Sequence, residues 1–358
     1  MKRSFLIILA CCLLLTGCVK QQILDRVNLF IVCAFDKAVR EQIEFTMAAT
    51  KYRSKQPGAV SNRLLSNVGE TSVGIKGLMD LQLSRPINTG KVSVILFGKD
   101  LAEKGISKQL DVVSRDAQAS QVMYLAIVNG NAKELLHANF SSDEEKGMYL
   151  FNLLDSNVKN GSVPRQNLHE FEYAYLGKGL DPFLPLLQLQ GEHVKISGLA
   201  LFKNDKHVAS LNEKEMFIFK LLYRNLRQGT IEADSGNGSR LAMKIVRSKV
   251  RYKVMKGIQG PRISINLSIK GEVIDAMQNK SPDQNLQQIR RLFEKDLTKN
   301  GMNLIHVFKT EKIDPLGLGD LVRSHTRGWK EEEWLRQYPQ TNVALDVNVE
   351  VVETGIQK

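Results

Sequence analysis

Alternation of apolar and polar residues is clearest in the last third of the chain. Residues 263–274 are expected to form a strand: over 263–270 isoleucine or leucine takes every second position and the residues between are polar, which is typical of a strand with one buried face. Residues 241–255 show the same period, with valine and tyrosine on one face and lysine and arginine on the other. Residues 341–353 repeat it with valines. The pattern predicts three strands here.

A helical pattern separates the second and third of these strands. Ser281-Pro282, with Gln284 as capping partner, predicts the start of a helix. Its apolar stripe keeps helical spacing across Asn300-Gly301, so we expect one helix to about residue 310. Asp314-Pro315 predicts a short helix after it. The block 241–353 is therefore expected to be strand, strand, long helix, short helix, strand, a compact α+β domain.

Strands and helices alternate through the first half of the chain. The expected strands are 27–35, 43–53, 91–97 and 122–128. The expected helices are 71–84 with a stripe at Val73, Leu78 and Leu81, a short one from Asp100 to Gly105, 110–119, and one that starts in Ser141-Ser142-Asp143-Glu144-Glu145 and ends at Gly161. Residues 56–70, rich in glycine, serine and asparagine, are expected to form an exposed loop.

The middle of the chain predicts a hairpin and one helix. Asn204-Asp205 is a natural turn between 198–203 and 207–211. Asn212 and Glu215 predict a capped helix over 213–228, and residues 230–240 are expected to be a loop. The whole is expected to be α+β, with mostly antiparallel or mixed sheets packed with helices. Its expected parts are an N-terminal domain (18–194), a middle hairpin-helix domain (195–240) that can recruit N-terminal segments, and a C-terminal domain (241–358).

The first 18 residues predict a lipoprotein signal. Lys2 and Arg3 precede an uncharged apolar run, too short for a membrane span, and Leu15-Thr16-Gly17-Cys18 closes it. This order predicts cleavage after residue 17 and lipidation of Cys18, as N-palmitoyl and S-diacylglycerol cysteine. Two acyl chains anchor stably where one is marginal. Cleavage leaves 341 residues (358 minus 17), more than one core usually serves.

Charge and cysteine content narrow the possible partners. The net charge of +12 becomes +10 once Lys2 and Arg3 leave, and a basic ectodomain is attracted to anionic lipid. Nucleic acid is disfavoured by the lipid signal and the lack of a nucleic-acid-binding pattern. Cys33 is the only other cysteine of the mature chain, so no internal disulfide can form. It is expected to be a small buried core residue, with a reactive thiol as the alternative.

Candidate catalytic and metal-binding residues are scarce. The sequence has no nucleophile elbow, HExxH, phosphate-binding loop or dinucleotide fingerprint, and its six histidines are scattered. Glu331–Glu333 is expected to be a solvated helix face rather than an acid site. The cations of 244–256 are either an exposed strand face kept soluble by charge or a surface for anionic lipid or an acidic partner. We expect no catalysis, no metal and no cofactor.

Six segments along the chain form a recognisable series. They are LDRVNLFIVCAFDKA (24–38), GKVSVILFGKDLAEKGISKQLDVVSRDAQ (90–118), GNAKELL (130–136), SGLALFKNDKHVASLNEKE (197–215), DPLGLGDLVRSHTRGWKEEEW (314–334) and VNVEVVETGI (347–356). Together these segments resemble the Ger(x)C family, the C-subunit lipoproteins of spore germinant receptors. Their order and spacing along the chain are more specific than any one of them.

The resemblance implies a three-domain, non-enzymatic lipoprotein on the outer face of the spore's inner membrane. Its implied partners are the two integral-membrane receptor subunits, of A type and B type, and its implied role is to help trigger germination. An extracytoplasmic solute-binding lipoprotein is the alternative function, and it would need two similar lobes around a cleft. A surface hydrolase is a third, disfavoured by the missing nucleophile constellation.

Overall fold

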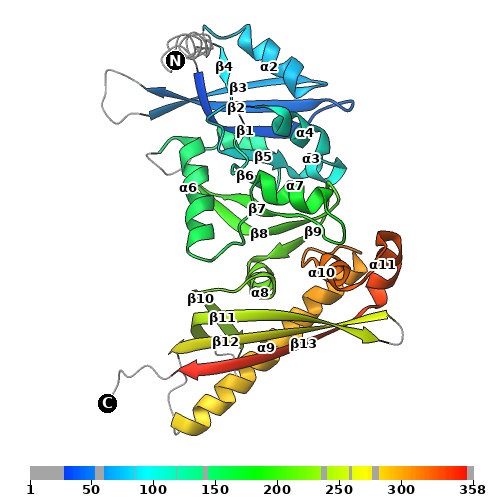
Figure 1. Ribbon diagram of the computed structural model, residues 1–358. Helices are drawn as coiled ribbons and strands as arrows, with labels where there is room; N and C mark the ends of the chain where they lie inside the picture. Colours follow the sequence, from blue (N-terminus) through cyan, green and yellow to red (C-terminus); the bar gives the residue numbers. More distant parts are fainter. Residues whose placement is uncertain are drawn as a thin grey trace, which may run out of the picture.

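The computed structural model describes residues 28–52, 60–84, 86–117, 119–139, 144–234, 240–257, 260–275 and 282–352. It is an α+β protein with one nine-stranded and one four-stranded sheet, which confirms the expected fold class (Figure 1). The larger sheet has the order β3-β2-β1-β5-β6-β7-β8-β9, with β4 added beside β1, and the smaller has the order β10-β11-β12-β13.

The larger sheet occupies one end of an elongated molecule. Its strands are β1 (Asn28–Lys37), β2 (Ile43–Tyr52), β3 (Val60–Gly69), β4 (Ile87–Asn88), β5 (Val94–Gly98), β6 (Tyr124–Val128), β7 (Phe183–Gln190), β8 (His193–Lys203) and β9 (Lys206–Asn212). The four central strands β1, β5, β6 and β7 are parallel, and antiparallel hairpins extend the sheet at both edges. The hairpin predicted at Asn204-Asp205 is confirmed as β8–β9.

Helices cover both faces of this sheet. One face packs against α2 (Ser72–Asp80), α3 (Lys99–Lys104), α4 (Ser107–Arg115) and α7 (Leu168–Leu176). The other packs against α5 (Ala132–His137), α6 (Lys146–Lys159) and α8 (Glu213–Tyr223). Because both faces are buried, the central strands β5 and β6 are apolar throughout rather than alternating.

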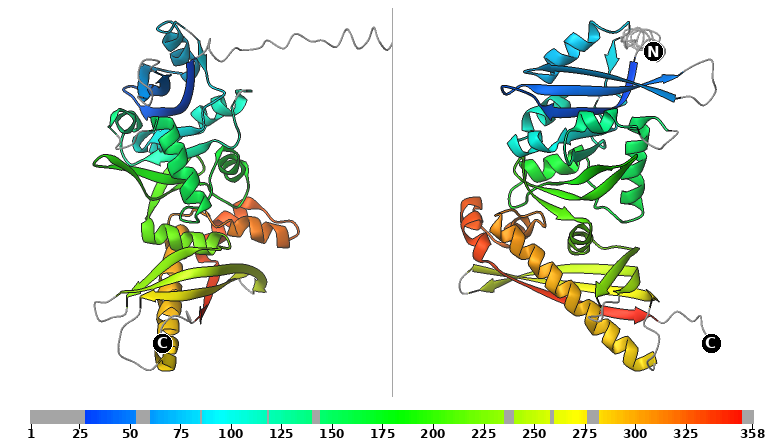
Figure 2. Two further views of the ribbon diagram at one scale, coloured as in Figure 1. Left: turned by 90° about the vertical axis from the view of Figure 1, so that its left-hand side faces the viewer. Right: turned by 180° about the vertical axis from the view of Figure 1, so that it is seen from behind.

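The smaller sheet has one covered and one open face. Its strands are β10 (Gly229–Asp234), β11 (Arg240–Gly257), β12 (Gly260–Asp275) and β13 (Asn342–Val352), and its helices are α9 (Pro282–Thr310), α10 (Leu318–His325) and α11 (Glu331–Gln337), followed by the 3-10 turn η2 (Tyr338–Gln340). The long helix α9 runs behind the strands in Figure 1 and in front of them in the right-hand view of Figure 2. No helix in the part of the chain that the structure describes packs on the opposite face.

The predicted C-terminal elements are confirmed. α9 continues without a break through Asn300-Gly301. A side chain at Gly301 would place its Cβ 2.5 Å from Leu345 Cδ2, so glycine lets α9 lie close to β13. The segment after Asp314-Pro315 forms two short helices rather than one. The caps predicted at Ser281 and Gln284 lie outside the residues whose side chains are described.

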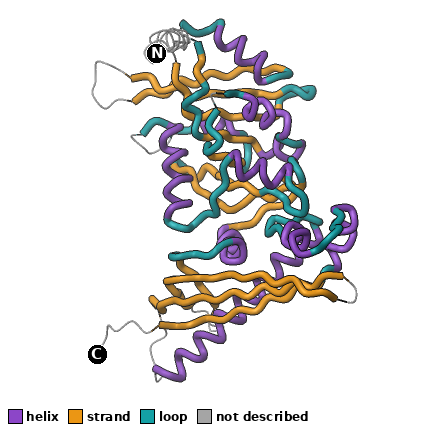
Figure 3. Tube along the Cα trace, viewed as in Figure 1, coloured by secondary structure: helices purple, strands orange, loops and turns teal. Residues whose placement is uncertain are grey.

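α8 joins the two sheets into one core. In Figure 3 the strands form two separate groups with α8 between them. The Phe219 ring of α8 lies 4.9 Å from that of Phe183 on β7 and 6.0 Å from that of Phe308 on α9, both edge-on. The capping box predicted for Asn212 and Glu215 is confirmed, but the helix ends at Tyr223 rather than at 228.

Two segments predicted as loops are strands. Residues 60–69 of the predicted loop 56–70 form β3, and residues 229–234 at the start of the predicted loop 230–240 form β10. Each is the outermost strand of its sheet on that side and pairs antiparallel with one neighbour. Polar residues are tolerated in an edge strand because the backbone pairing needs no apolar side chain.

Other predicted details are refined. α6 begins at Lys146 with the Glu145 side chain accepting from Met148 N at 2.9 Å; the predicted cap residues Ser141–Asp143 lie outside the described residues. The three-part division of the chain stays a prediction. Its expected boundary at residue 195 falls within β8, which is hydrogen-bonded into the larger sheet, while β10 pairs with β11.

Candidate functional site

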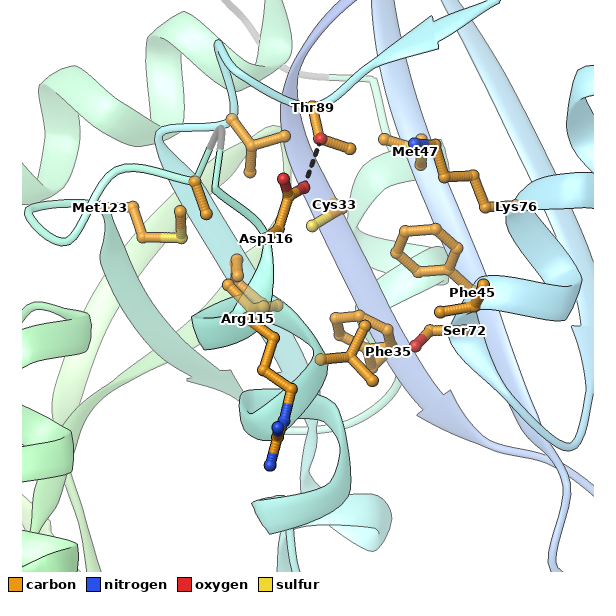
Figure 4. Close-up of a pocket in the computed structure, with 16 residues that line it drawn as sticks. Cys33, Phe35, Phe45, Met47, Ser72, Lys76, Thr89, Arg115, Asp116 and Met123 are labelled. Carbon is orange, nitrogen blue, oxygen red and sulfur yellow. Dashed lines mark hydrogen bonds between the residues drawn. The ribbon is translucent and has the colours of Figure 1, made fainter.

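An apolar cavity of about 420 Å³ opens on one face of the larger sheet, between α2 and α4. Figure 4 shows its lining side chains, with Cys33 and Phe35 on β1 at the floor, Phe45 and Met47 beyond them, and Thr89 and Asp116 at one rim. This size lies within the range of small-molecule sites. The lining comes from β1, β2, β5, α2, α4 and the segments between them, so no short sequence pattern could have revealed it.

The cavity floor is chemically inert. Phe35 stacks on Phe45 at 4.7 Å and on Phe97 at 5.7 Å between ring centroids. Burial raises the pKa of the Cys33 thiol to about 12, so the thiol stays protonated at neutral pH and is a poor nucleophile. Cys33 is therefore a buried core residue, as predicted.

Arg115 and Asp116, two charged residues of the rim, have structural partners. Thr89 Oγ1 donates to Asp116 Oδ2 at 2.7 Å, and Arg115 Nε lies 2.9 Å from Asp111 Oδ1. The arrangement suits an apolar group in the cavity and offers no paired general acid and base there.

A second, buried polar site lies where the two sheets' domains meet. Asp181, before β7, and Asp314, before α10, are joined by two hydrogen bonds. Asp181 N donates to the backbone Asp314 O at 3.0 Å, and Asp314 N donates to the side-chain Asp181 Oδ2 at 2.8 Å. Lys203 Nζ lies 3.0 Å from the same Asp181 oxygen. Both aspartates precede a proline, a shared signal that the sequence prediction used only at Asp314-Pro315.

The Asp314 carboxylate caps the chain that enters α10. Its two oxygens accept from Leu318 N at 2.9 Å and from Gly319 N at 2.6 Å. Burial raises the pKa of Asp314 to about 7, while the two amide donors pull that pKa down. At Gly319 a Cβ would lie 2.7 Å from Gly179 Cα, so the backbones of the two domains touch at a pair of glycines.

The predicted basic strand is exposed. Lys244, Arg247, Lys249, Arg251 and Lys253 of β11 all point to the open face of the smaller sheet. Among the described residues none of these five forms an ion pair, whereas Lys270 on the same face lies 2.6 Å from Glu350. The register places three of them beside neutral Ser268, Asn266 and Ser264. The side chain of Lys256 lies outside the described residues.

The histidine and glutamate candidates from the sequence show no sign of a catalytic or metal site in the described residues. His207 is buried with Nε2 2.9 Å from Ser210 Oγ, and Glu332 and Glu333 are exposed at the start of α11, as expected of a solvated face. Within the described ranges, no three His, Cys, Asp or Glu side chains gather as a metal site would need.

Cys18, the one site residue predicted from the sequence, lies outside the described residues, so its lipidation stays a prediction. The first described residue, Asn28, follows ten positions later (28 minus 18) and opens β1. None of the helices in the described ranges combines the length and apolar character that crossing a bilayer requires.

Two protein-family models match this chain, one in each half. A family model described as the spore germination protein N-terminal domain matches residues 20–189. A second, described as spore germination B3/GerAC like, C-terminal, matches residues 197–355. This chain belongs to the Ger(x)C family. The resemblance seen in the sequence is thereby confirmed, and the Ger(x)C models cover both halves of the chain in order.

Alignments with individual relatives cover almost the whole of this Ger(x)C chain. It is 29% identical over 360 residues to the spore germination protein GerQC of Bacillus cereus, covering 99% of each protein. It is 21% identical over 368 residues to the putative spore germination protein YfkR of Bacillus subtilis (strain 168), covering 96% of this chain and 94% of that protein. The crystal structure of the GerBC protein shares the fold, with a TM-score of 0.62 and 20% identity over 89% of this chain and 96% of that one.

Proposed function

We propose that this Ger(x)C protein is a non-catalytic, lipid-anchored subunit of a spore nutrient germinant receptor that helps trigger germination. The observation that carries the proposal is the family match, which covers 20–189 and 197–355 and so leaves little of the mature chain unaccounted for. The receptor would act on the outer face of the spore's inner membrane.

The N-terminal sequence supports the anchor. Leu15-Thr16-Gly17-Cys18 ends a short charged-then-apolar leader, which suits cleavage before Cys18 and attachment of lipid to its thiol and amino group. The lipid, rather than a membrane-spanning helix, would hold the ectodomain at the bilayer. The partners would be the integral-membrane A-type and B-type subunits that the family resemblance implies.

The structural surroundings of the reactive side chains support a non-catalytic role. Cys33 is buried and protonated, Asp314 is bound by backbone amides, and His207 lies against Ser210. A solute-binding lipoprotein would instead need two similar lobes around a cleft. The two sheets differ in strand number and order, and they share one apolar core through α8.

Fractionation tests the anchor. A Cys18→Ala variant is expected to leave the membrane fraction, whereas Cys12→Ala, which changes a cysteine of the cleaved leader, should stay in it. Retention of Cys18→Ala at the wild-type level, in membranes washed with high salt, would show that Cys18 carries no anchor.

Deletion and recovery of the complex test the receptor role. Spores lacking the gene, and any paralogue of the same receptor type, are expected to lose germination with nutrients and to keep it with non-nutrient triggers. The native protein should co-purify with two integral-membrane subunits from detergent-treated spore membranes. Normal nutrient germination of such spores would refute the receptor role, and co-purification with a transport permease instead would favour the solute-binding alternative.

A further inference from the structure

The outer face of α2 is apolar and uncharged. Val73 is 65% exposed, Leu78 49% and Leu81, the residue that caps the helix, 85%. Gly74 and Gly77 lie between these residues on the same side of the helix. A Cβ added at Gly77 would meet nothing within 4 Å, so this side is open. These five positions follow the spacing i, i+1, i+4, i+5 and i+8, which gathers them on one side of a helix.

This pattern is the reverse of an ordinary surface helix. The opposite side of α2 already supplies the core, since Ile75 and Met79 are 1% and 0% exposed. A surface helix normally turns charged residues toward water. Here the charged Lys76 and Asp80, four residues apart and so on the same edge of the helix, are both half-buried. The exposed arc beside them has no charge. The helical stripe predicted at Val73, Leu78 and Leu81 is therefore the exposed side of α2, and Ile75 and Met79 form its buried side.

α2 lies beside the point where the lipidated end of the chain enters the fold. Asp80, its last residue, accepts a hydrogen bond through Oδ1 from Ile87 N of β4 at 2.8 Å. Ile87 in turn pairs with Asn28, the first residue of β1. Asn28 follows Cys18 by only ten positions, a separation of at most about 35 Å even in a fully extended chain. Figures 1 and 2 show α2 at the extreme end of the molecule, next to β4.

We propose that α2 is a membrane-contact helix, which rests Val73, Leu78 and Leu81 in the interface of the bilayer that holds the Cys18 lipid. The inference rests on the lipidation proposed above. The bilayer is the occupant favoured by this geometry because the tether confines α2 to within its length of the membrane surface and the exposed face carries no charge to be desolvated. A helix pressed there by its apolar face would set the orientation of the ectodomain, with the smaller sheet pointing away.

Binding to vesicles tests the contact without the lipid. The mature chain carrying Cys18→Ala is mixed with phosphatidylcholine vesicles, with and without anionic phosphatidylglycerol. We expect weak binding that persists in high salt. Leu78→Ser with Leu81→Ser should weaken that binding about tenfold or more. The matched control is Leu176→Ser with Leu335→Ser, which changes two exposed leucines of α7 and α11 and should leave binding unchanged.

A second readout locates the contact. A polarity-sensitive dye on Leu78→Cys, in the Cys18→Ala chain, is expected to shift its emission to the blue when vesicles are added, while the same dye on Leu176→Cys should not respond. The buried Cys33 thiol should not compete for the label. Circular dichroism should show all variants folded, because each change lies on the surface.

The results separate this inference from the proposed anchor. Equal vesicle binding by the α2 and control double variants, or no blue shift at residue 78, would overturn the membrane contact while leaving lipidation of Cys18 standing. Loss of the integral-membrane subunits on co-purification of the α2 variant, without loss of vesicle binding, would assign the face to a protein partner and also overturn it. Failure of the anchor would instead appear in the Cys18→Ala fractionation, which does not involve α2.

Discussion

The two ends of this molecule expose opposite kinds of surface. At one end α2 turns three apolar side chains and two glycines outward, next to the tether to Cys18. At the other, β11 turns five lysine and arginine side chains outward, on a sheet face that none of the described helices covers. In each case the opposite side of the same helix or strand is buried in the core.

The difference teaches how exposure should be interpreted. Water solvates the β11 cations, and their charge discourages another chain from stacking on an open sheet. The basic face of β11 therefore needs no partner to be stable in water, whether or not it also binds an acidic one. The α2 face gains nothing from water and is expected to be covered by a second apolar phase. Exposed charge is therefore weak evidence for a partner here, and exposed leucine beside the proposed lipid tether is stronger evidence.

The largest expected effect concerns the contact of Asp181 with Asp314, which joins the two halves of the molecule. The pKa of Asp314 is raised by burial to about 7, above the ordinary value of 3.8. The unfolded chain therefore releases this proton at lower pH than the folded chain, so wild type should lose stability as the pH rises from about 4 to 7, by at most about 4 kcal/mol.

Asp314→Asn removes the titrating carboxyl group, so comparing this variant with wild type isolates the contribution of Asp314. The free energy of unfolding of wild type minus that of Asp314→Asn, from urea titrations at pH 4 to 8, should fall across this window and then level off. A difference that stays constant with pH would mean that the carboxylate, held by Leu318 N and Gly319 N, is already ionised throughout and that the contact is not pH-dependent.

A smaller effect distinguishes the two faces of α2. Met79→Ala should lower the free energy of unfolding by about 3 kcal/mol, because a fully buried side chain leaves a cavity. Leu78→Ala, one residue earlier, should change it by less than about 0.5 kcal/mol. Chemical denaturation measures both. Comparable losses would mean that Leu78 is packed in the isolated protein, and the contrast between the two ends of the molecule would disappear.

The smallest effect is expected on the basic face. Lys249, Arg251 and Lys253 are spaced two residues apart, about 7 Å, and repel one another weakly. Replacing all three by glutamine should change stability by less than about 1 kcal/mol and should reduce the gain in stability that wild type shows when salt is added. Thermal unfolding at low and high salt measures this. An unchanged salt response would indicate that the charges are already screened or paired.

Much of the fold was predictable because its signals are local. The strands near 241–255, 263–274 and 341–353 follow from period-two alternation, and the cap at Asn212 and Glu215 follows from residue chemistry at fixed spacing. The edge strands β3 and β10 were missed because their pairing depends on backbone groups of a neighbour, which the side chains do not encode strongly.

The candidate sites divide in the same way. Cys18 could be predicted because a peptidase and a lipid transferase recognise a short linear segment, and the sequence by itself contains it. The cavity between α2 and α4, the contact of Asp181 with Asp314 across 133 residues, and the exposure of Leu78 could not. They depend on which residues the packing brings together, and helical spacing alone shows that a stripe exists without showing which stripe the sheet covers. The sequence thus determined most of the elements and contains the signal for the proposed anchor, and the tertiary structure decided which faces of those elements are left open to solvent, a membrane or a partner.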